Sequence, residues 1–388
     1  MERVQDSDRV SVAGNILSSW KAITNGVVAK TTSDRQKYWR HWCRYTALFK
    51  YDPFLSTAPP TDKDCIICAF GANVRTGVYG RGAQVKVQTV TDALSAISTT
   101  IQLASQRSPV YREDQKYTLA IERMVEGFRR EDPPSIPQLA VPVIVPNACY
   151  EASMKTSNIK LRHTGSLVII AFYYLLRVGE YTKPRTVQRN GKAIRATRTK
   201  QFSVGNVGFF KAGKIVPRTS SLKELLSCDS ATLKITNQKN GRMGDTVHQK
   251  TTGLDNCPIK ALANIVHHIL SHGGTNERLL CEYCIDDSWY SLVSGDIVLC
   301  VRSTAKVLRL DKQGIDPDLI GAHSLRAGGA MALRLHGYED TVIMKMGRWT
   351  SLTFLQYIHT QIAHLAEDIS KKMSIPLPFL NIASIEGH

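Results

Sequence analysis

The stretch GAHSLRAGGA, residues 321–330, places His323 and Arg326 three residues apart and follows them with a pair of glycines. Each glycine inside a helix costs about 0.5–1 kcal/mol relative to alanine, so the pair indicates that something approaches the backbone closely. If a helix begins near Ser324, His323 and Arg326 lie on one side of its N-terminus, where free N–H groups and the helix dipole favour an anion such as phosphate. Packing against another helix would explain the glycines equally well.

The charge balance of the whole chain favours a polyanionic partner. Its 388 residues include 50 Lys and Arg against 33 Asp and Glu, which gives a formal net charge of +17. Such an excess suits nucleic acid, whose phosphates release counterions when they are neutralised. A ribosomal or membrane-surface role fits the charge equally well. The hydrophobic content of 43% is that of a globular protein rather than a disordered one.

Cysteine usage and hydropathy indicate the compartment. Nine scattered cysteines are an odd number in a long chain, which favours reduced thiols inside a cell. Two CxxC pairs, at 65–68 and 281–284, supply only two zinc ligands each, and the first lies in an apolar run typical of a core, so we predict no metal and no cofactor. The beginning of the chain lacks the apolar region of a secretory signal, and the run at 167–176 is about half a membrane span. We expect a soluble intracellular protein.

A proline-rich stretch marks the clearest domain boundary. Residues 130–147 contain five prolines, which block helices and stiffen extended linkers. We therefore predict an all-helical domain at 1–132, a linker at 133–146 and a second domain at 147–388. The predicted fold class is multidomain and mainly α, with a mixed α+β second domain that contains a small antiparallel sheet.

The first domain shows helical periodicity. We predict helices at 32–51, 88–105 and 117–130. The aromatic residues of the first helix recur at intervals of three or four and form one face, which we interpret as core: Trp39, Trp42, Tyr45 and Phe49. Arg40 and Arg44 remain on the same helix for solvent or for phosphate.

The second domain mixes helices and strands. SLVIIAFYYLLR predicts a buried helix that ends at Arg177, and residues 257–273 predict another helix. Strand-like runs occur at 206–210, 232–238 and 245–252, and the last two flank the hairpin turn KNGRMG.

The segment 183–200 carries seven basic residues and no acidic one. It is either a solvated loop or a flap that contacts phosphates. We predict DNA contacts from Arg185, Arg189, Lys192, Arg195, Arg198 and Lys200.

Two helices are predicted near the end of the chain. The first runs from Asp340 to Met346 and stops at a glycine, and the second begins near Thr350 or Ser351, either of which caps a helix well. The apolar stripe of the second helix consists of Phe354, Leu355, Ile358, Ile362 and Leu365. At about 100° per residue, Tyr357 lies roughly 100° from the centre of this stripe and is not a central core position. An exposed structural tyrosine is the alternative interpretation.

The order of these residues resembles the tyrosine recombinase and integrase superfamily. The matching stretches are YYLLRVGEY, HSLRAGGA, GRWTS and FLQYIHT, within residues 147–365. The combination of HSLRAGGA with GRW is most similar to the eukaryotic, crypton-type members. The N-terminal helices resemble the family's core-binding domain much more weakly.

The resemblance implies a reaction in which Tyr357 attacks a phosphodiester in line. The attack forms a covalent 3′-phosphotyrosine and frees a 5′-hydroxyl, with no metal required. Arg177 and Arg326 would clamp the non-bridging oxygens, on which negative charge develops.

The remaining roles follow from the same resemblance. His323 would hydrogen-bond the phosphate or assist proton transfer. Lys239, in the hairpin turn, would protonate the leaving oxygen as general acid, with Lys234 and Lys250 as alternatives. Trp349 occupies a position where many members have histidine, and its indole N–H donates a hydrogen bond but carries no proton.

The expected function is that of a site-specific, transposase-like DNA recombinase or integrase. A type IB topoisomerase and a domesticated DNA-binding protein without strand exchange are the alternatives. The expected partner is double-stranded DNA, bound by a homo-oligomer that is a dimer on one site and a tetramer in synapsis. The tail at about 366–388 would dock on a neighbouring protomer. The similarity of the motifs to eukaryotic members implies a nuclear location.

Overall fold

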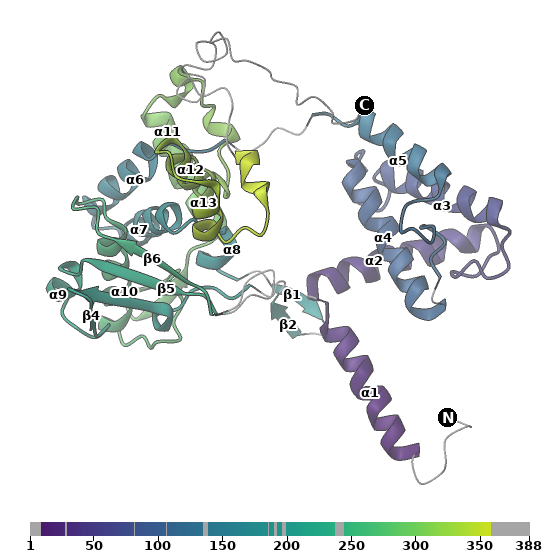
Figure 1. The fold of residues 1–388 in the computed structure, drawn as a ribbon, viewed down its shortest axis with the longest axis horizontal. Coiled ribbons are helices and arrows are strands. Elements are labelled where there is room, and N and C mark those ends of the chain that lie inside the picture. The colour runs from purple at the N-terminus through teal and green to yellow at the C-terminus, as the bar shows by residue number, and fades with distance from the viewer. Residues whose placement is uncertain are drawn as a thin grey trace, which may run out of the picture. The chain divides into compact units, whose positions relative to one another are not determined.

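The computed structural model describes residues 9–27, 29–80, 82–105, 107–134, 139–184, 186–189, 192–195, 199–236 and 244–357. The chain forms two compact units. The first comprises Met1–Ser135 and Arg185–Thr197, and the second comprises Ile136–Pro184 and Arg198–His388. Helices dominate both units, and the second contains a small antiparallel sheet (Figure 1). The predicted fold class is confirmed.

The proline-rich stretch is not extended throughout, because helix α6 (Ile144–Met154) begins inside the predicted linker. Pro146 lies in the first turn of α6. Backbone N–H groups in the first turn have no partner within a helix, so the missing N–H of proline costs no hydrogen bond there. The segment 185–197, which we placed in the second domain, groups with the first unit.

The first unit contains five helices among its described residues. They are α1 (Arg9–Asn25), α2 (Ala29–Leu48), α3 (Pro60–Arg75), α4 (Val87–Ser105) and α5 (Leu119–Glu131). Trp42 is fully buried, and its indole N–H donates to the carbonyl of Pro53 at 2.7 Å. Trp39 and Tyr45 pack on the same core. Phe49 is 44% exposed, because α2 ends one residue before it and the helical face does not continue.

Two short strands lie within the segment 183–200. Strands β1 (Thr186–Arg189) and β2 (Lys192–Arg195) are antiparallel, with Thr186 opposite Arg195.

The second unit is built around α7 (Ile159–Tyr173), in which every residue from 163 to 172 is buried. Helix α7 contacts α6, α10 (Pro258–Ser271), α11 (Ser294–Val307) and α12 (Ser324–Leu335) (Figure 1). In the described part of this unit, the remaining α-helices are α8 (Val178–Tyr181), α9 (Leu222–Leu226) and α13 (Asp340–Gly347). The 3-10 helices among its described residues are Val204–Asn206, Leu310–Gln313, Pro317–Leu319 and η5 (Leu352–Tyr357).

The sheet of the second unit has four strands in the order β4-β3-β5-β6. The strands are β3 (Val207–Lys211), β4 (Lys214–Val216), β5 (Ser230–Lys234) and β6 (Thr246–Lys250). The antiparallel pairing of β5 with β6 confirms the two strands predicted for the hairpin, whose turn at 237–243 lies outside the described residues. A separate pair consists of β7 (Glu282–Ile285) and β8 (Ser288–Ser291).

Close packing explains the glycine pair Gly328 and Gly329. A Cβ atom on Gly328 would lie 2.1 Å from the carbonyl oxygen of Val141 and 3.0 Å from the ring of Phe172. A Cβ on Gly329 would lie 2.5 Å from the carbonyl oxygen of Phe172. Helix α12 therefore approaches both α7 and the segment before α6 at distances that only glycine permits.

His163 gives the second unit a predictable sensitivity to acid. It is fully buried, its Nε2–H donates to the carbonyl of Leu280 at 2.7 Å, and burial lowers its pKa from 6.5 to about 4. Above pH 6.5 the imidazole is neutral in both the folded and the unfolded chain. As the pH falls from about 6.5 to about 4, only the unfolded chain takes up the proton, so the stability decreases, by up to about 3 kcal/mol.

The measurement is the free energy of unfolding by urea at a series of pH values. His163→Gln keeps a donor for the Leu280 carbonyl but does not titrate, so the stability of the variant should decrease less between pH 6.5 and 4 than that of the natural chain. An unchanged curve would show that His163 is not buried as a neutral imidazole.

Candidate functional site

Arg326 lies in the first turn of α12 and points inward, with 2% of its surface exposed. One terminal nitrogen donates to the carbonyl of Leu175, and the other donates to the carbonyl of Gly347. The indole of Trp349 covers the guanidinium, with the ring centre 4.1 Å from Cζ, a cation–π contact. Arg326 thus ties together the start of α12, the chain after α7 and the end of α13.

Arg177 caps the short helix α8 instead of ending the buried helix before it. Helix α7 stops at Tyr173, and Leu175 takes a left-handed conformation with φ of 48°, which turns the chain earlier than predicted. The backbone N–H of Arg177 donates to Oε2 of Glu180 at 2.8 Å, and Nη1 lies 3.3 Å from Oε1 of the same carboxylate. Nη2 donates to the carbonyl of Arg348 at 3.4 Å.

Arg348 and Glu180 form a buried ion pair that sequence reasoning missed. Nη2 of Arg348 donates to Oε2 of Glu180 at 2.8 Å, and the two side chains are 2% and 3% exposed. Both residues lie in stretches on which the family resemblance rests, RVGEY and GRW. The signal that could have identified them was a charged residue close to a predicted site residue. Glu180 follows Arg177 by three residues, and Arg348 directly precedes Trp349.

The arginines also satisfy the carbonyl groups at the end of α7. The last carbonyls of a helix have no partner within it. Arg348 donates to the carbonyl of Tyr174 at 3.4 Å and to that of Leu175 at 3.2 Å, and Arg326 donates to Leu175 as well. The negative end of the α7 dipole therefore faces two guanidinium groups, which stabilises both the helix end and the arginines.

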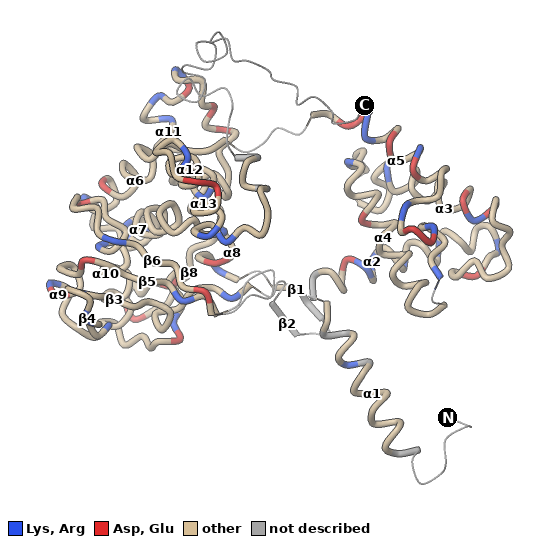
Figure 2. The backbone as a smooth tube through the Cα atoms, in the orientation of Figure 1, with Lys and Arg blue, Asp and Glu red and all other residues tan. Residues whose placement is uncertain are grey.

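The local charges act on Arg348 in both directions. Burial lowers the pKa of Arg348, the Glu180 carboxylate raises it, Arg177 lowers it and Asp245 raises it, so that the net direction is downward. Asp245 directly precedes β6, which places the turn end of the β5–β6 hairpin within electrostatic range of the arginines. Three arginines and one glutamate leave two positive charges at this arginine cluster, which we define as Arg177, Arg326 and Arg348. Figure 2 shows blue Lys and Arg segments of the tube near α8 and α13.

The sheet register constrains the candidate general acid. Residues paired directly opposite each other share one face of a sheet, and the faces alternate along a strand. Lys234 and Lys250 are paired with Thr246 and Ser230, so they share the outward face. Gln249 is on the other face, where its side chain donates to the carbonyl of Tyr173 at 2.6 Å. Both alternatives to Lys239 thus lie on the face turned away from α7.

Lys239 itself falls in the turn, outside the part of the chain that the structure describes. Its role as general acid stays a prediction.

His323 and Arg326 differ more than the sequence suggested. His323 is the N-cap of α12 and is exposed, and its carbonyl accepts the N–H of Ala327 at 3.0 Å. Arg326 is buried because the chain after α7 and the end of α13 cover the first turn of the helix.

Trp349 packs flat against the end of α13. A Cβ on Gly347 would lie 1.7 Å from the indole, so only glycine fits beneath the ring. Phe354 is fully buried, and its ring centre lies 5.5 Å from that of Trp349.

Tyr357 is the last residue of η5, a 3-10 helix where we predicted an α-helix. A 3-10 helix has three residues per turn, and of the two described stripe positions Phe354 is buried whereas Leu355 is 41% exposed. The side chain of Tyr357 and the predicted stripe positions Ile358, Ile362 and Leu365 lie outside the described residues.

The predicted DNA-contacting residues lie in several parts of the chain. Arg40 and Arg44 are exposed on α2, and Lys200 is exposed in the second unit. Arg189 belongs to β1, and Lys192 and Arg195 belong to β2, but their side chains are not described. Arg185 and Arg198 are outside the described ranges.

Metal-binding clusters and membrane-spanning helices are the two remaining features to consider. Within the described ranges, no group of three or more His, Cys, Asp or Glu side chains is arranged to hold a metal ion. No described helix combines the length and the apolar character needed to cross a membrane.

Comparisons with known proteins give one kind of match. No protein-family model and no curated protein sequence matches the chain. Among solved structures, it is similar to the Tn1549 transposon integrase in complex with transposon right end DNA, at a TM-score of 0.43 and 8% identity, covering 80% of this chain and 85% of that one. It is also similar to the XerH site-specific recombinase bound to difH substrate, at a TM-score of 0.43 and 14% identity over 80% of this chain and 70% of that one.

A third similar structure is the XerA recombinase, at a TM-score of 0.36 and 14% identity over 91% of this chain and 96% of that one. At such identities and TM-scores the likeness carries no inference about activity.

Proposed function

We propose that the chain breaks and rejoins DNA strands through a covalent phosphotyrosine intermediate, as a site-specific recombinase or integrase of the tyrosine recombinase type. The observation that carries the proposal is the convergence of two motifs distant in the sequence. Arg326 donates to the carbonyls of Leu175 and Gly347, and Arg177 donates to the carbonyl of Arg348. The arginines of YYLLRVGEY and HSLRAGGA therefore meet beside GRW.

The arginine cluster suits a reacting phosphodiester. In the proposed step the phenol oxygen of Tyr357 attacks phosphorus, a P–O bond to the enzyme forms, and the bond to the 5′-oxygen breaks. His323 assists removal of the phenol proton, and Lys239 delivers a proton to the 5′-oxygen. The positive charge of the arginines stabilises the charge that develops on the non-bridging oxygens.

The two arginines enter this scheme differently. The side chain of Arg177 is 22% exposed and within reach of a bound phosphate. Arg326 is 2% exposed with both terminal nitrogens on carbonyls, so direct contact requires it to exchange one carbonyl for a phosphate oxygen. Until then its charge acts on the site through the protein interior, where screening by water is weak.

The partner that this chemistry requires is double-stranded DNA, which also accounts for the formal net charge of +17. The dimer on one site, the tetramer in synapsis and the crypton-type relationship belong to the same proposal. The nuclear location does too.

The test is covalent trapping on DNA. The full chain is incubated with nicked duplexes taken from the DNA that flanks its own gene, with a metal chelator present, and is then denatured. We expect a protein–DNA adduct at a 3′ end for the natural sequence and none for Tyr357→Phe, because the variant lacks the attacking oxygen. Tyr338→Phe is the matched control, since Tyr338 is 49% exposed and outside the arginine cluster; it should still form the adduct.

The outcomes separate the alternatives. An adduct on random sequence with relaxation of supercoiled DNA by a monomer would favour the topoisomerase. Salt-sensitive DNA binding without any adduct on the flanking DNA would favour a DNA-binding protein that lacks strand exchange. An adduct that survives in Tyr357→Phe would show that another residue is the nucleophile.

A further inference from the structure

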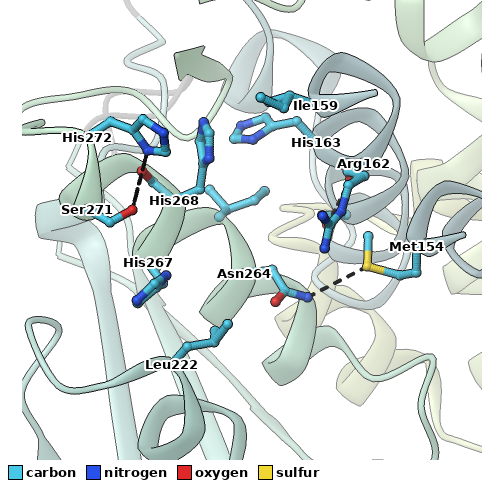
Figure 3. Close-up of a pocket in the computed structure, with 12 residues that line it drawn as sticks. Met154, Ile159, Arg162, His163, Leu222, Asn264, His267, His268, Ser271 and His272 are labelled. Atoms are coloured by element: carbon cyan, nitrogen blue, oxygen red, sulfur yellow. Dashed lines mark hydrogen bonds between the residues drawn. The ribbon is translucent and has the colours of Figure 1, made fainter. Parts of the chain in front are cut away.

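A second site lies at the other end of α7 from the arginine cluster. A cavity of about 300 Å³ opens between α7 and α10, bordered by α6 and α9 (Figure 3). Its volume falls at the lower end of the range usual for small-molecule sites. All of its lining belongs to the second unit, so the cavity depends on a single packed body.

The polar lining of this cavity is cationic or neutral. It includes Arg162 and four of the chain's 11 histidines, and no aspartate or glutamate is among the lining residues. The four histidines are His163, His267, His268 and His272. Arg162 forms no ion pair with an acidic residue in the part of the chain that the structure describes. Figure 3 shows its side chain reaching from α7 into the space that faces α10.

The hydrogen bonds fix which imidazole atoms carry protons. Nε2 of His268 accepts the backbone N–H of Cys284 at 3.1 Å, so in the neutral ring the proton is on Nδ1. Nδ1–H of His272 donates to the carbonyl of His268 at 2.8 Å. The rings of these two histidines lie 4.4 Å apart. Asn264 adds an amide, whose Nδ2 donates to the hydroxyl of Tyr150 at 3.1 Å.

The charged side chain that lines the cavity, that of Arg162, is positive. Burial, together with the charges of His272, Arg162 and His267, lowers the pKa of His268 to about 4. Neighbouring groups that disfavour a further proton favour an anion in the same place. Because none of the lining side chains is acidic, this preference is not neutralised within the cavity.

Nonpolar side chains complete the lining. Ile159, Leu222 and Met154 border the same space as the polar groups. A ligand that fills the cavity therefore meets an arginine and imidazoles on one part of its surface and aliphatic side chains on another. Such a mixture of apolar wall and few polar groups is usual for sites that bind small organic molecules.

We propose that this cavity binds a small organic anion, with its phosphate or carboxylate group on the guanidinium of Arg162 and its nonpolar part against Ile159, Leu222 and Met154. The site is separate from the arginine cluster: Arg162 and Tyr173 are eleven residues apart on α7, which corresponds to about 17 Å along the helix. The proposal does not depend on DNA strand exchange.

The test is isothermal titration of the full chain, without DNA, using phenyl phosphate and inorganic phosphate as probes. We expect saturable binding of phenyl phosphate that weakens about tenfold or more in Arg162→Gln, since a charge-assisted contact is lost. Lys223→Gln is the matched control, because it removes one exposed positive charge next to Leu222 without touching the lining. Lys223→Gln should bind phenyl phosphate within about twofold of the natural chain. Arg177→Gln weakens phosphate binding at the arginine cluster, so the phenyl phosphate binding that remains in this variant is assigned to the cavity.

Each result decides the matter. Weaker binding of inorganic phosphate than of phenyl phosphate supports a role for the nonpolar wall, and equal binding of the two overturns that part of the proposal. No saturable binding up to about 10 mM, or binding that is lost in Arg177→Gln and kept in Arg162→Gln, overturns the site itself. Circular dichroism of each variant confirms folding, which surface substitutions such as Arg162→Gln should preserve.

Discussion

Replacing Glu180 by glutamine should lower the free energy of unfolding of the second unit by about 3–5 kcal/mol. The glutamine keeps the shape and an acceptor for the backbone N–H of Arg177, but it removes the charge that faces Arg348. The guanidinium of Arg348 is 2% exposed and would remain charged without its partner. Scanning calorimetry of the full chain measures the loss in the transition of the second unit.

A double variant distinguishes the ion pair from simple damage to packing. Adding Arg348→Met to Glu180→Gln removes the unpaired charge, so the double variant should be more stable than either single variant. If the two single effects add without any recovery, the ion pair does not exist in solution. The nick-trapping assay on the same variants should show a loss of adduct for Glu180→Gln, because the carboxylate also holds Arg177.

Gly328→Ala should destabilise the second unit by about 3 kcal/mol. The new Cβ would meet the carbonyl oxygen of Val141 at 2.1 Å, and a backbone atom cannot turn aside as the end of a side chain can. The gain in helix propensity, about 1 kcal/mol, offsets only part of this cost. Urea denaturation followed by circular dichroism measures the difference.

Gly295→Ala is the control for this prediction. Gly295 lies in α11 of the same unit, and its Cβ would find only Val293 at 4.0 Å. Its stability should change by no more than about 0.5 kcal/mol, or increase slightly. Equal effects of the two substitutions would mean that α12 does not approach Val141 closely.

Helices with a full hydrophobic period were predictable from the sequence. Helices α4, α5 and α10 lie where the 3.6-residue pattern placed them, and α12 begins at Ser324 as predicted. The strands β5 and β6 were also predictable, because alternating residues flank a turn of Asn and Gly. In these elements the local preference and the packed structure agree.

The element boundaries around the arginine cluster were not predictable. The apolar run SLVIIAFYYLLR continues through Leu176, yet α7 ends at Tyr173. The turn there is stabilised by Arg348 and Arg326, which donate to the carbonyls that follow the helix. Those arginines come from segments far along the chain, so no local pattern in the run could predict their contacts.

The sequence by itself determined the mainly helical class, the basic charge and the short motifs that contain Arg177, His323, Arg326 and Tyr357. Only the tertiary structure decided that Glu180 and Arg348 form a buried pair, that Arg326 faces inward, and that the glycines serve packing rather than a ligand. The physical reason is that periodicity records which face of a helix avoids water. It carries no record of which distant carbonyl or carboxylate satisfies a buried charge, because that depends on how the helices meet.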